Sequence, residues 1–281
     1  MRVVVLGASG FIGRRLTAAL AARGDDVVGA SLRDPLSAAR TADRADAVVN
    51  LAGAPVARRW SERQKEAIVR SRTELPRRFL DALAALPQPP RTYVSASAVG
   101  YYGTSLTATF TESSPPGDDF LGRSCVAWET EARRAEALGM RVALVRTGLA
   151  LGAEGGALAR LLPLFRARLG GVVASGAQWY SWVHVDDVVG IYLHLLDGDA
   201  RGPYNATAPN PVTNREFTRA LAAAVRRPAF LPVPALAVRA ILGEGATIVV
   251  DGQRVVPERT LASGYAFRYP EVGAALRAVA G

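Results

Sequence analysis

The sequence predicts an α/β protein built on a doubly wound parallel sheet, a Rossmann fold, with a small C-terminal region that covers the substrate. Uninterrupted segments without polar side chains, such as 3–6 and 27–30, have the pattern of strands buried on both faces. Segments with helical spacing alternate with them, and a glycine-rich turn, GASGFIG, follows the first strand directly. With 281 residues the chain can form one large α/β domain, or a nucleotide domain with a smaller cap.

Hydrophobic periodicity and the glycines and prolines that end helices predict each element of the first 150 residues. Gly24 ends the first helix, and the cluster of Pro87, Pro89 and Pro90 ends the helix before the fourth strand. Right-handed crossovers bring the carboxyl ends of all the strands to one edge, where ligands bind. The expected strands are 3–6, 27–30, 47–51, the segment TYVSASAV and 141–145, and the expected helices are 11–23, 61–86 and about 122–138.

The pattern changes after about residue 150. We expect residues 1–150 to form the NAD(P)-binding Rossmann domain, with returning elements around 183–206. Residues 151–281 are expected to be mainly the substrate-covering region, with a helix over 157–169. The tail from Phe230 is rich in Pro and Gly, which predicts part of a small cap.

Composition excludes several classes of protein. No apolar run approaches the ~20 residues that span a bilayer, and a strand beginning at Val3 leaves no room for a leader, so we expect a cytoplasmic protein. Cys125 is the single cysteine, which excludes an internal disulfide and a cysteine-based zinc cluster. With only His184 and His194 as histidines, we predict no metal site.

The formal charge of +9 does not predict a nucleic-acid partner. Lys65 is the one lysine among 34 basic residues, and the arginines form scattered doublets rather than one basic segment. We therefore expect a small-molecule substrate and no membrane or nucleic-acid partner, while the oligomeric state is open.

The glycine turn predicts a dinucleotide site. Gly7 lets the chain turn sharply, Gly10 lets the backbone approach a pyrophosphate, and Gly13 lets the helix pack closely on the sheet. The helix N-terminus then offers unpaired N–H groups and its positive dipole end to the phosphates.

The end of the second strand indicates NADP. An acidic residue there would hold the ribose 2′-hydroxyl of NAD, but this chain has Ser31 and Arg33. A hydroxyl and a guanidinium can bind a 2′-phosphate. The alternative is that Arg33 faces water and Asp34 serves NAD.

The motifs GASGFIG, NLAG, SASAVGYYG, RTGLALG and SWVHVDDVV, in this order, resemble the extended short-chain dehydrogenase/reductases, which include sugar-nucleotide epimerases and dehydratases. The tail GEGATIVVDGQRVVPERTLASGYAFRYP is similar to that of the atypical epimerase-family proteins. The resemblance covers nearly the whole chain, and it implies an active-site role for Ser97. It also implies cofactor-side positions at Gly7, Ser9, Gly10, Phe11, Ile12, Arg33, Leu51, Ala52, Gly53 and Ser97.

The catalytic pair of the resembled superfamily, a tyrosine and a lysine four residues later, is absent. Leu121 and Cys125 stand in the two places. The lysine lowers the tyrosine pKa for proton transfer, so either the acid has moved or the reaction is lost. Candidate replacements are Tyr101, Tyr102, Glu112 and Cys125, although Tyr102 can also simply pack under the loop.

Further candidates lie near the expected pocket. Arg146 could grip a phosphate or carboxylate, and His184 could be a donor, although a structural histidine is the favoured interpretation. Asp186 or Asp187 is expected to cap a helix beginning near Val188. Aromatic side chains at Trp179, Tyr180 and Trp182 are expected to divide between pocket wall and core.

The function that these features predict is an NADP-binding oxidoreductase, similar to epimerases and dehydratases, that acts on a small polar substrate. One alternative is a non-catalytic NADP(H)-binding sensor or interaction protein, which the missing pair favours. A strict sugar-nucleotide epimerase needs tightly held NAD and a base on each face of the sugar, and the sequence supplies neither clearly.

Overall fold

A six-stranded parallel sheet forms the centre of the computed structural model, which describes residues 1–280. The strand order is β10-β6-β4-β3-β1-β2, so β2 and β3 lie on opposite sides of β1. This reversal is the switch point beside which doubly wound sheets bind ligands, and it confirms the predicted fold class. The strands are β1 (Arg2–Leu6), β2 (Asp26–Ala30), β3 (Ala47–Asn50), β4 (Thr92–Ala98), β6 (Arg141–Thr147) and β10 (Gly202–Ala206).

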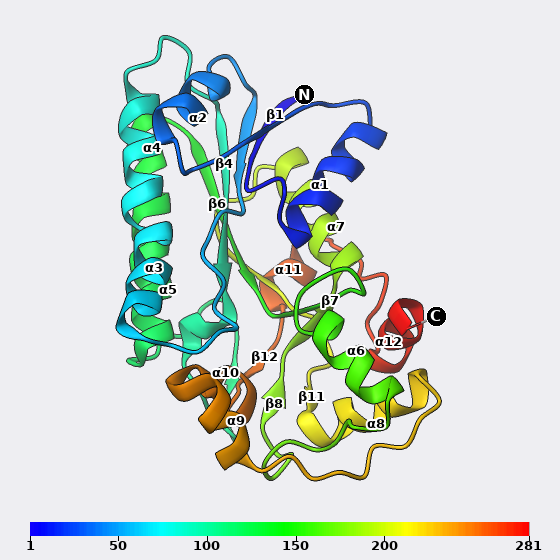
Figure 1. Ribbon diagram of the computed structural model, residues 1–281. Coiled ribbons are helices and arrows are strands. Elements are labelled where there is room, and N and C mark those ends of the chain that lie inside the picture. The colour runs from blue at the N-terminus through cyan, green and yellow to red at the C-terminus, as the bar shows by residue number, and fades with distance from the viewer. Residues whose placement is uncertain (281) are drawn as a thin grey trace.

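Helices cover both faces of the sheet (Figure 1). One core joins α1 and α7 to side chains such as Val3 and Val5, and the other joins α2, α4 and α5 to the alternate side chains Val4 and Leu6. Successive residues of a strand point to opposite faces, so both faces need apolar side chains. The helices are α1 (Phe11–Ala22) and α7 (Val185–Asp197) on one face, and α2 (Pro35–Ala42), α3 (Glu62–Arg72), α4 (Glu74–Ala84) and α5 (Phe120–Arg133) on the other, with the short helices η1 (Val99–Tyr102) and η2 (Arg134–Leu138).

The remaining elements gather at the carboxyl end of the sheet, in the lower half of Figure 1. A third core packs α6, α8 and α12 around Trp182 and Phe217. These elements are β5 (Thr109–Phe110), β7 (Leu149–Leu151), α6 (Leu158–Arg166), β8 (Trp179–Tyr180), β9 (Trp182–His184), β11 (Val212–Thr213), α8 (Asn214–Ala224), α9 (Ala235–Leu242), η3 (Gly243–Ala246), α10 (Thr247–Val250), β12 (Arg254–Val255), α11 (Glu258–Ala262) and α12 (Val272–Ala280).

Two helices differ from the sequence-based expectation in ways that have a clear physical cause. The helix expected over 61–86 is broken at Thr73, whose φ and ψ are −117° and −66°. Pro76 explains the break, because its ring lacks an N–H and collides with the carbonyl of the residue four positions earlier. The helix expected near Val188 begins at Val185, and its cap is His184, whose Nδ1 accepts the N–H of Asp186 at 3.1 Å.

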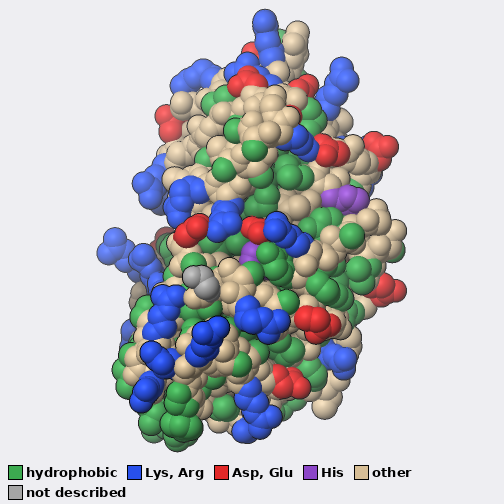
Figure 2. Space-filling model, turned by 90° about the vertical axis from the view of Figure 1, so that its right-hand side faces the viewer, with side chains coloured by type: hydrophobic (Ala, Val, Ile, Leu, Met, Phe, Trp, Pro, Cys, Tyr) green, Lys and Arg blue, Asp and Glu red, His purple; other side chains and the backbone are tan. Residues whose placement is uncertain are grey.

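Charged side chains are spread over the whole face drawn in Figure 2, with acidic groups among the arginines. Many arginines of the described residues form surface ion pairs, such as Arg15 with Glu154 at 2.8 Å and Arg134 with Asp81 at 2.8 Å. Among residues 1–280, no helix combines the length and the apolar character needed to cross a membrane.

The C-terminal segment is fastened to α7 through the buried carboxylate of Asp187. This carboxylate accepts the hydroxyl of Tyr265 at 3.1 Å and the backbone N–H groups of Arg268 and Tyr269 at 2.7 and 3.0 Å. It is completely buried, so each of these bonds forms in a region of low dielectric, where an unpaired donor is costly.

We expect Asp187→Ala to lower the free energy of unfolding by about 3 kcal/mol, because three donors of the C-terminal segment lose their buried acceptor. Urea unfolding followed by circular dichroism measures the change. The matched control is Asp186→Ala, which removes a half-exposed carboxylate paired with Arg15 and should cost less than about 1 kcal/mol. Equal losses in the two variants would contradict the anchoring role of Asp187.

Candidate functional site

The turn after β1 brings three backbone segments into direct contact. Gly7 has φ +83°, and a Cβ there would lie 3.0 Å from the backbone N of Ala52. A Cβ on Gly13 would lie 2.3 Å from the carbonyl O of Gly7. A side chain at either position would therefore push α1 or the end of β3 away from the turn.

The first turn of α1 offers free backbone donors. Its N-cap is Gly10, which has no side chain to accept the N–H groups that follow, and both Ser9 and Gly10 are exposed. Orphan N–H groups at a helix N-terminus, together with the positive end of the helix dipole, form an anion site. Phe11 closes one side of the turn by packing against Gly152 and Gly155, where a Cβ would lie 2.4 and 2.5 Å from its ring.

The end of β2 lies beside the same turn, because the N–H of Gly7 bonds to the carbonyl of Ala30 at 3.1 Å. Arg33 is exposed, and its guanidinium has no hydrogen-bond or ion-pair partner within residues 1–280. The carboxylate of Asp34 caps α2 by accepting the N–H of Ser37 at 3.0 Å. Arg33 is thus available to an anion, whereas Asp34 is already bonded to the protein.

Ser97 and Arg146, both nominated from the sequence, belong to one buried network. Ser97, Arg146 and Asn205 face one another across β4, β6 and β10, so they share a level of the sheet. Arg146 forms a two-point ion pair with Glu129 of α5, with both N–O distances at 2.8 Å, and the Ser97 hydroxyl donates to the same carboxylate at 2.7 Å. The Arg146 side chain is 3% exposed, so this guanidinium neutralises Glu129 rather than facing the pocket.

Tyr101 and Tyr102 pack on the same arginine. The Arg146 guanidinium lies 3.4 Å from the ring centroid of Tyr101, and its Nη1 donates to the hydroxyl of Tyr102 at 3.0 Å. That hydroxyl in turn donates to Asn205 at 2.7 Å. Burial raises the pKa of Tyr102 to about 12, even though the Arg146 charge acts in the opposite direction.

His184 and Trp179 are also engaged by the protein. His184 is buried under the ring of Tyr269, with 4.0 Å between ring centroids, and burial lowers its pKa. Trp179 donates its Nε1–H to the carbonyl of Leu106 at 2.9 Å. The burial of His184 and its contact with Tyr269 fit the structural role expected for this histidine.

A cavity of about 850 Å³ extends from the glycine turn to the C-terminal segment. Of the nominated residues, Phe11, Ile12, Trp179, Tyr180 and Cys125 line it, whereas Ser97, Tyr101, Tyr102, Arg146, Trp182, His184 and Glu112 do not. Catalytic roles for Ser97, Tyr101 and Tyr102 therefore stay predictions. Sequence analysis missed Arg72, a lining residue at the end of α3, because nothing in its local pattern distinguishes it from the other arginines.

Leu121 and Cys125, in the places of the usual tyrosine and lysine, both face this cavity. Burial raises the pKa of the Cys125 thiol to about 12, and the nearby Arg72 charge offsets only part of this shift. Cys125 is thus a neutral thiol at ordinary pH, with little nucleophilic or basic character.

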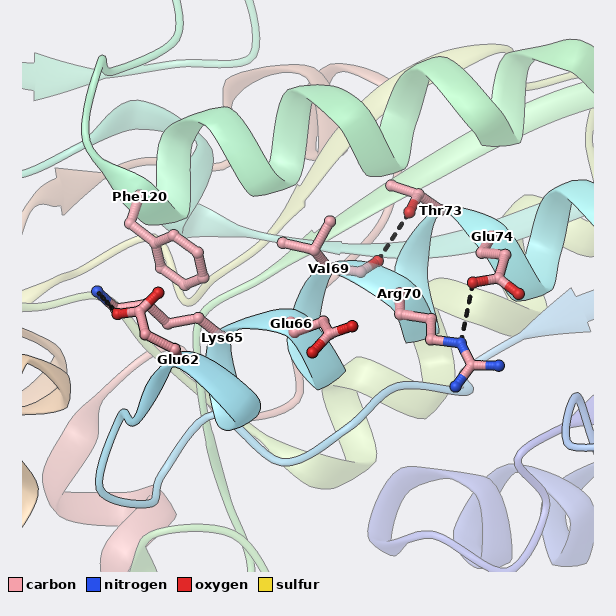
Figure 3. Close-up of a pocket in the computed structure, with 8 residues that line it drawn as sticks. All are labelled: Glu62, Lys65, Glu66, Val69, Arg70, Thr73, Glu74 and Phe120. Atoms are coloured by element: carbon pink, nitrogen blue, oxygen red, sulfur yellow. Dashed lines mark hydrogen bonds and ion pairs between the residues drawn. The ribbon is translucent and has the colours of Figure 1, made fainter.

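A second pocket, of about 570 Å³, lies on the outer side of α3 (Figure 3). Most of its charged side chains pair with one another or with Glu244 of η3, for example Lys65 with Glu62 at 3.3 Å and Arg70 with Glu74 at 2.9 Å. This pocket has no buried polar group that awaits a ligand, and it lies away from the glycine turn.

Comparison with known proteins identifies two family regions. Residues 3–207 match the NAD dependent epimerase/dehydratase family, and residues 233–279 match a domain of unknown function, DUF1731. The chain is 41% identical to human epimerase family protein SDR39U1, with 99% of each chain covered. It is 42% identical to a chloroplastic homologue from Arabidopsis thaliana, with 99% and 86% covered. The cytoplasmic location expected for this chain stays a prediction.

The crystal structure of the human protein SDR39U1 (isoform 2) with NADPH superimposes with a TM-score of 0.92 at 39% identity, covering 100% of this chain and 99% of the human chain. A structure described as a nucleoside-diphosphate sugar epimerase from Corynebacterium glutamicum has a TM-score of 0.82 at 35% identity, covering 100% and 58%.

The Glu129–Arg146 pair should behave as a coupled buried unit. We expect Glu129→Gln to lower the free energy of unfolding by about 3 kcal/mol, because it leaves the Arg146 charge without a counter-charge. The double variant Glu129→Gln, Arg146→Met should lose less than the sum of the two single variants. A double-mutant cycle by urea unfolding measures the coupling, and strictly additive losses would refute it.

Proposed function

Because the chain belongs to the NAD dependent epimerase/dehydratase family, we propose that it binds NADPH at the glycine turn and acts as an NADP-dependent enzyme on a substrate held in the adjoining cavity. The observation that carries this proposal is the turn itself, where Gly7 and Gly13 leave no room for a Cβ. The crystal structure of the human relative with NADPH supports the choice of cofactor.

The residues present fit a dinucleotide. The uncapped N–H groups after Gly10 would hold the pyrophosphate, since a helix N-terminus binds anions without further charge. Phe11 and Ile12 line the cavity beside the turn. In the segment Leu51, Ala52 and Gly53 after β3, the first two residues lie directly against Gly7.

The choice of NADP over NAD rests on Arg33 and Ser31. Arg33 has no partner within residues 1–280, whereas Asp34 is used as a helix cap. A guanidinium can bind a 2′-phosphate through two charge-assisted hydrogen bonds, and a hydroxyl beside it adds a third.

We expect Arg33→Ala to weaken NADPH binding by about 10- to 100-fold and to leave NADH binding nearly unchanged, because only the 2′-phosphate contact is lost. Titration of cofactor fluorescence measures both affinities. Arg40→Ala is the matched control, since Arg40 is an exposed arginine in the last turn of the helix that follows Arg33. Wild-type protein that binds NADH as tightly as NADPH would overturn the NADP assignment.

When bound, NADPH supplies a hydride. The chain supplies a largely apolar cavity that orients the substrate and excludes water, and it supplies no tyrosine–lysine relay, because Leu121 and Cys125 stand there. A role for Ser97, Tyr101 or Tyr102 in proton transfer requires that side chain to leave its network with Arg146 and Glu129.

A second candidate function is a non-catalytic NADPH-binding protein. The observation that favours it is the neutral thiol of Cys125 facing the cavity, in the place where the resembled enzymes have a lysine. Deuterium transfer from labelled NADPH to a panel of carbonyl compounds separates the two functions. Tight NADPH binding with no transfer to any compound would favour the binding protein.

We expect Cys125→Ala to leave NADPH affinity and any turnover within about two-fold of wild type, because a thiol with a pKa near 12 contributes no charge at neutral pH. Fluorescence titration and deuterium transfer test this. A drop of more than ten-fold in turnover, with unchanged NADPH affinity, would instead assign Cys125 to proton transfer.

A further inference from the structure

Arg72, the last residue of α3, has a guanidinium that is only half satisfied by the protein. Its Nη1 donates to the carbonyls of Ala54 and Ile68 at 3.1 and 3.2 Å and to the hydroxyl of Ser71 at 3.3 Å. Nε and Nη2 have no acceptor in the part of the chain from 1 to 280. Nη1 therefore fixes the side chain in place, while the N–H groups of Nε and Nη2 make no hydrogen bond within residues 1–280.

The charge of Arg72 also lacks a carboxylate partner. No acidic oxygen of residues 1–280 lies within 4.0 Å of it, whereas the buried Arg146 is paired with Glu129. Burial lowers the pKa of Arg72 because no counter-charge offsets the loss of water. The ring of Trp128 lies 4.7 Å away and compensates part of the charge, but a ring stabilises a cation less than an anion does.

Arg72 lies between the cofactor side of the cavity and the wall that α5 forms. A Cβ on Gly53 would lie 3.1 Å from Nη2, so this nitrogen contacts the segment after β3 that packs against the glycine turn. Trp128 and Cys125 of α5 lie on the other side, and all three side chains line the cavity. A ligand group bound to Nε or Nη2 is thus adjacent to the proposed cofactor site.

Most of the remaining cavity wall is apolar. Among its charged residues, Asp119 caps α5 by accepting the N–H of Gly122 at 2.7 Å, and Asp251 accepts the hydroxyl of Thr247 at 2.9 Å. Arg160 is exposed and donates to the carbonyl of Ala57 at 2.9 Å. The apolar wall includes Leu121, Leu149, Leu161, Phe165, Phe217 and Ile248.

From this arrangement we propose that Arg72 binds the carboxylate of the substrate, and that the substrate is a largely apolar monocarboxylic acid. The proposal rests on the proposed function, since it names the occupant of the cavity beside the cofactor. Arg72 and Arg160 both line the cavity without a carboxylate partner in the described residues, but Arg160 is exposed to water. The desolvated charge of Arg72 beside an apolar wall matches one negative charge on an apolar body. The two phosphates of a sugar nucleotide need several cations, and the hydroxyls of a sugar need a polar wall. This replaces the small polar substrate expected from the sequence.

The test compares charged and neutral forms of one ligand. Calorimetry measures the binding of 3-phenylpropanoate and octanoate, and of their uncharged amides, to wild-type protein with and without NADPH. We expect each acid to bind at least about ten-fold more tightly than its amide, because a charge-assisted hydrogen bond to a desolvated guanidinium distinguishes the two.

Variants then assign the difference to Arg72. Arg72→Gln should remove the preference for the acid, and Arg72→Lys should retain part of it, because the positive charge is kept while the planar donor pair is lost. Arg70→Gln is the matched control, since Arg70 lies on the outer side of the same helix and pairs with Glu74. Circular dichroism verifies that each variant is folded.

The proposal is overturned if neither acid binds, if acid and amide bind equally to the wild type, or if Arg72→Gln keeps the preference for the acid. It is also overturned if Arg72→Gln weakens NADPH alone, because the arginine then serves the cofactor. The wild-type comparison decides the ligand class even if Arg72→Gln does not fold. Failure of NADPH binding in the wild type would overturn the proposed function instead. The comparison of acid and amide without cofactor would then still test the ligand class.

Discussion

Direct contact between backbone segments at the glycine turn is the constraint on which the rest of the structure depends. Gly7, Gly13 and the end of β3 meet at distances that exclude a Cβ, so the first strand, the first helix and the third strand take up one fixed arrangement. The switch in strand order is located there, and with it the crevice and the free N–H groups of α1. The position of the cavity beside this point follows from the topology, and its chemistry follows from the side chains that line it.

Much of the fold could be predicted from the sequence because its signals are local. A strand, a glycine turn and a helix in succession can each be recognised from the residues of that segment alone. Apolar runs such as Val3–Leu6 need helices packed on both faces of the sheet. The break at Thr73 was missed although Pro76 marks it, because the apolar spacing continues on both sides of the proline.

The candidate site was less predictable, because its contacts join residues far apart in the chain. Arg146 looked like the end of a strand, but β6 continues to Thr147, and the register places Arg146 between Ser97 and Asn205 inside the sheet. Nothing near Arg146 in the sequence identifies Glu129 as its partner. The same holds for Arg72, whose importance lies in the absence of a nearby carboxylate, and only the three-dimensional arrangement reveals that absence.

The anchoring of the last residues by Asp187 affects how the protein completes its structure during translation. The Rossmann strands up to β10 are synthesised well before Tyr265, Arg268 and Tyr269, so the nascent chain can begin to assemble its sheet while the Asp187 carboxylate is still hydrated. That carboxylate obtains these donors only when residues 265–269 have been synthesised. Their attachment to α7 is therefore a late step of folding, and a chain that ends before Tyr265 keeps the Asp187 carboxylate in contact with water.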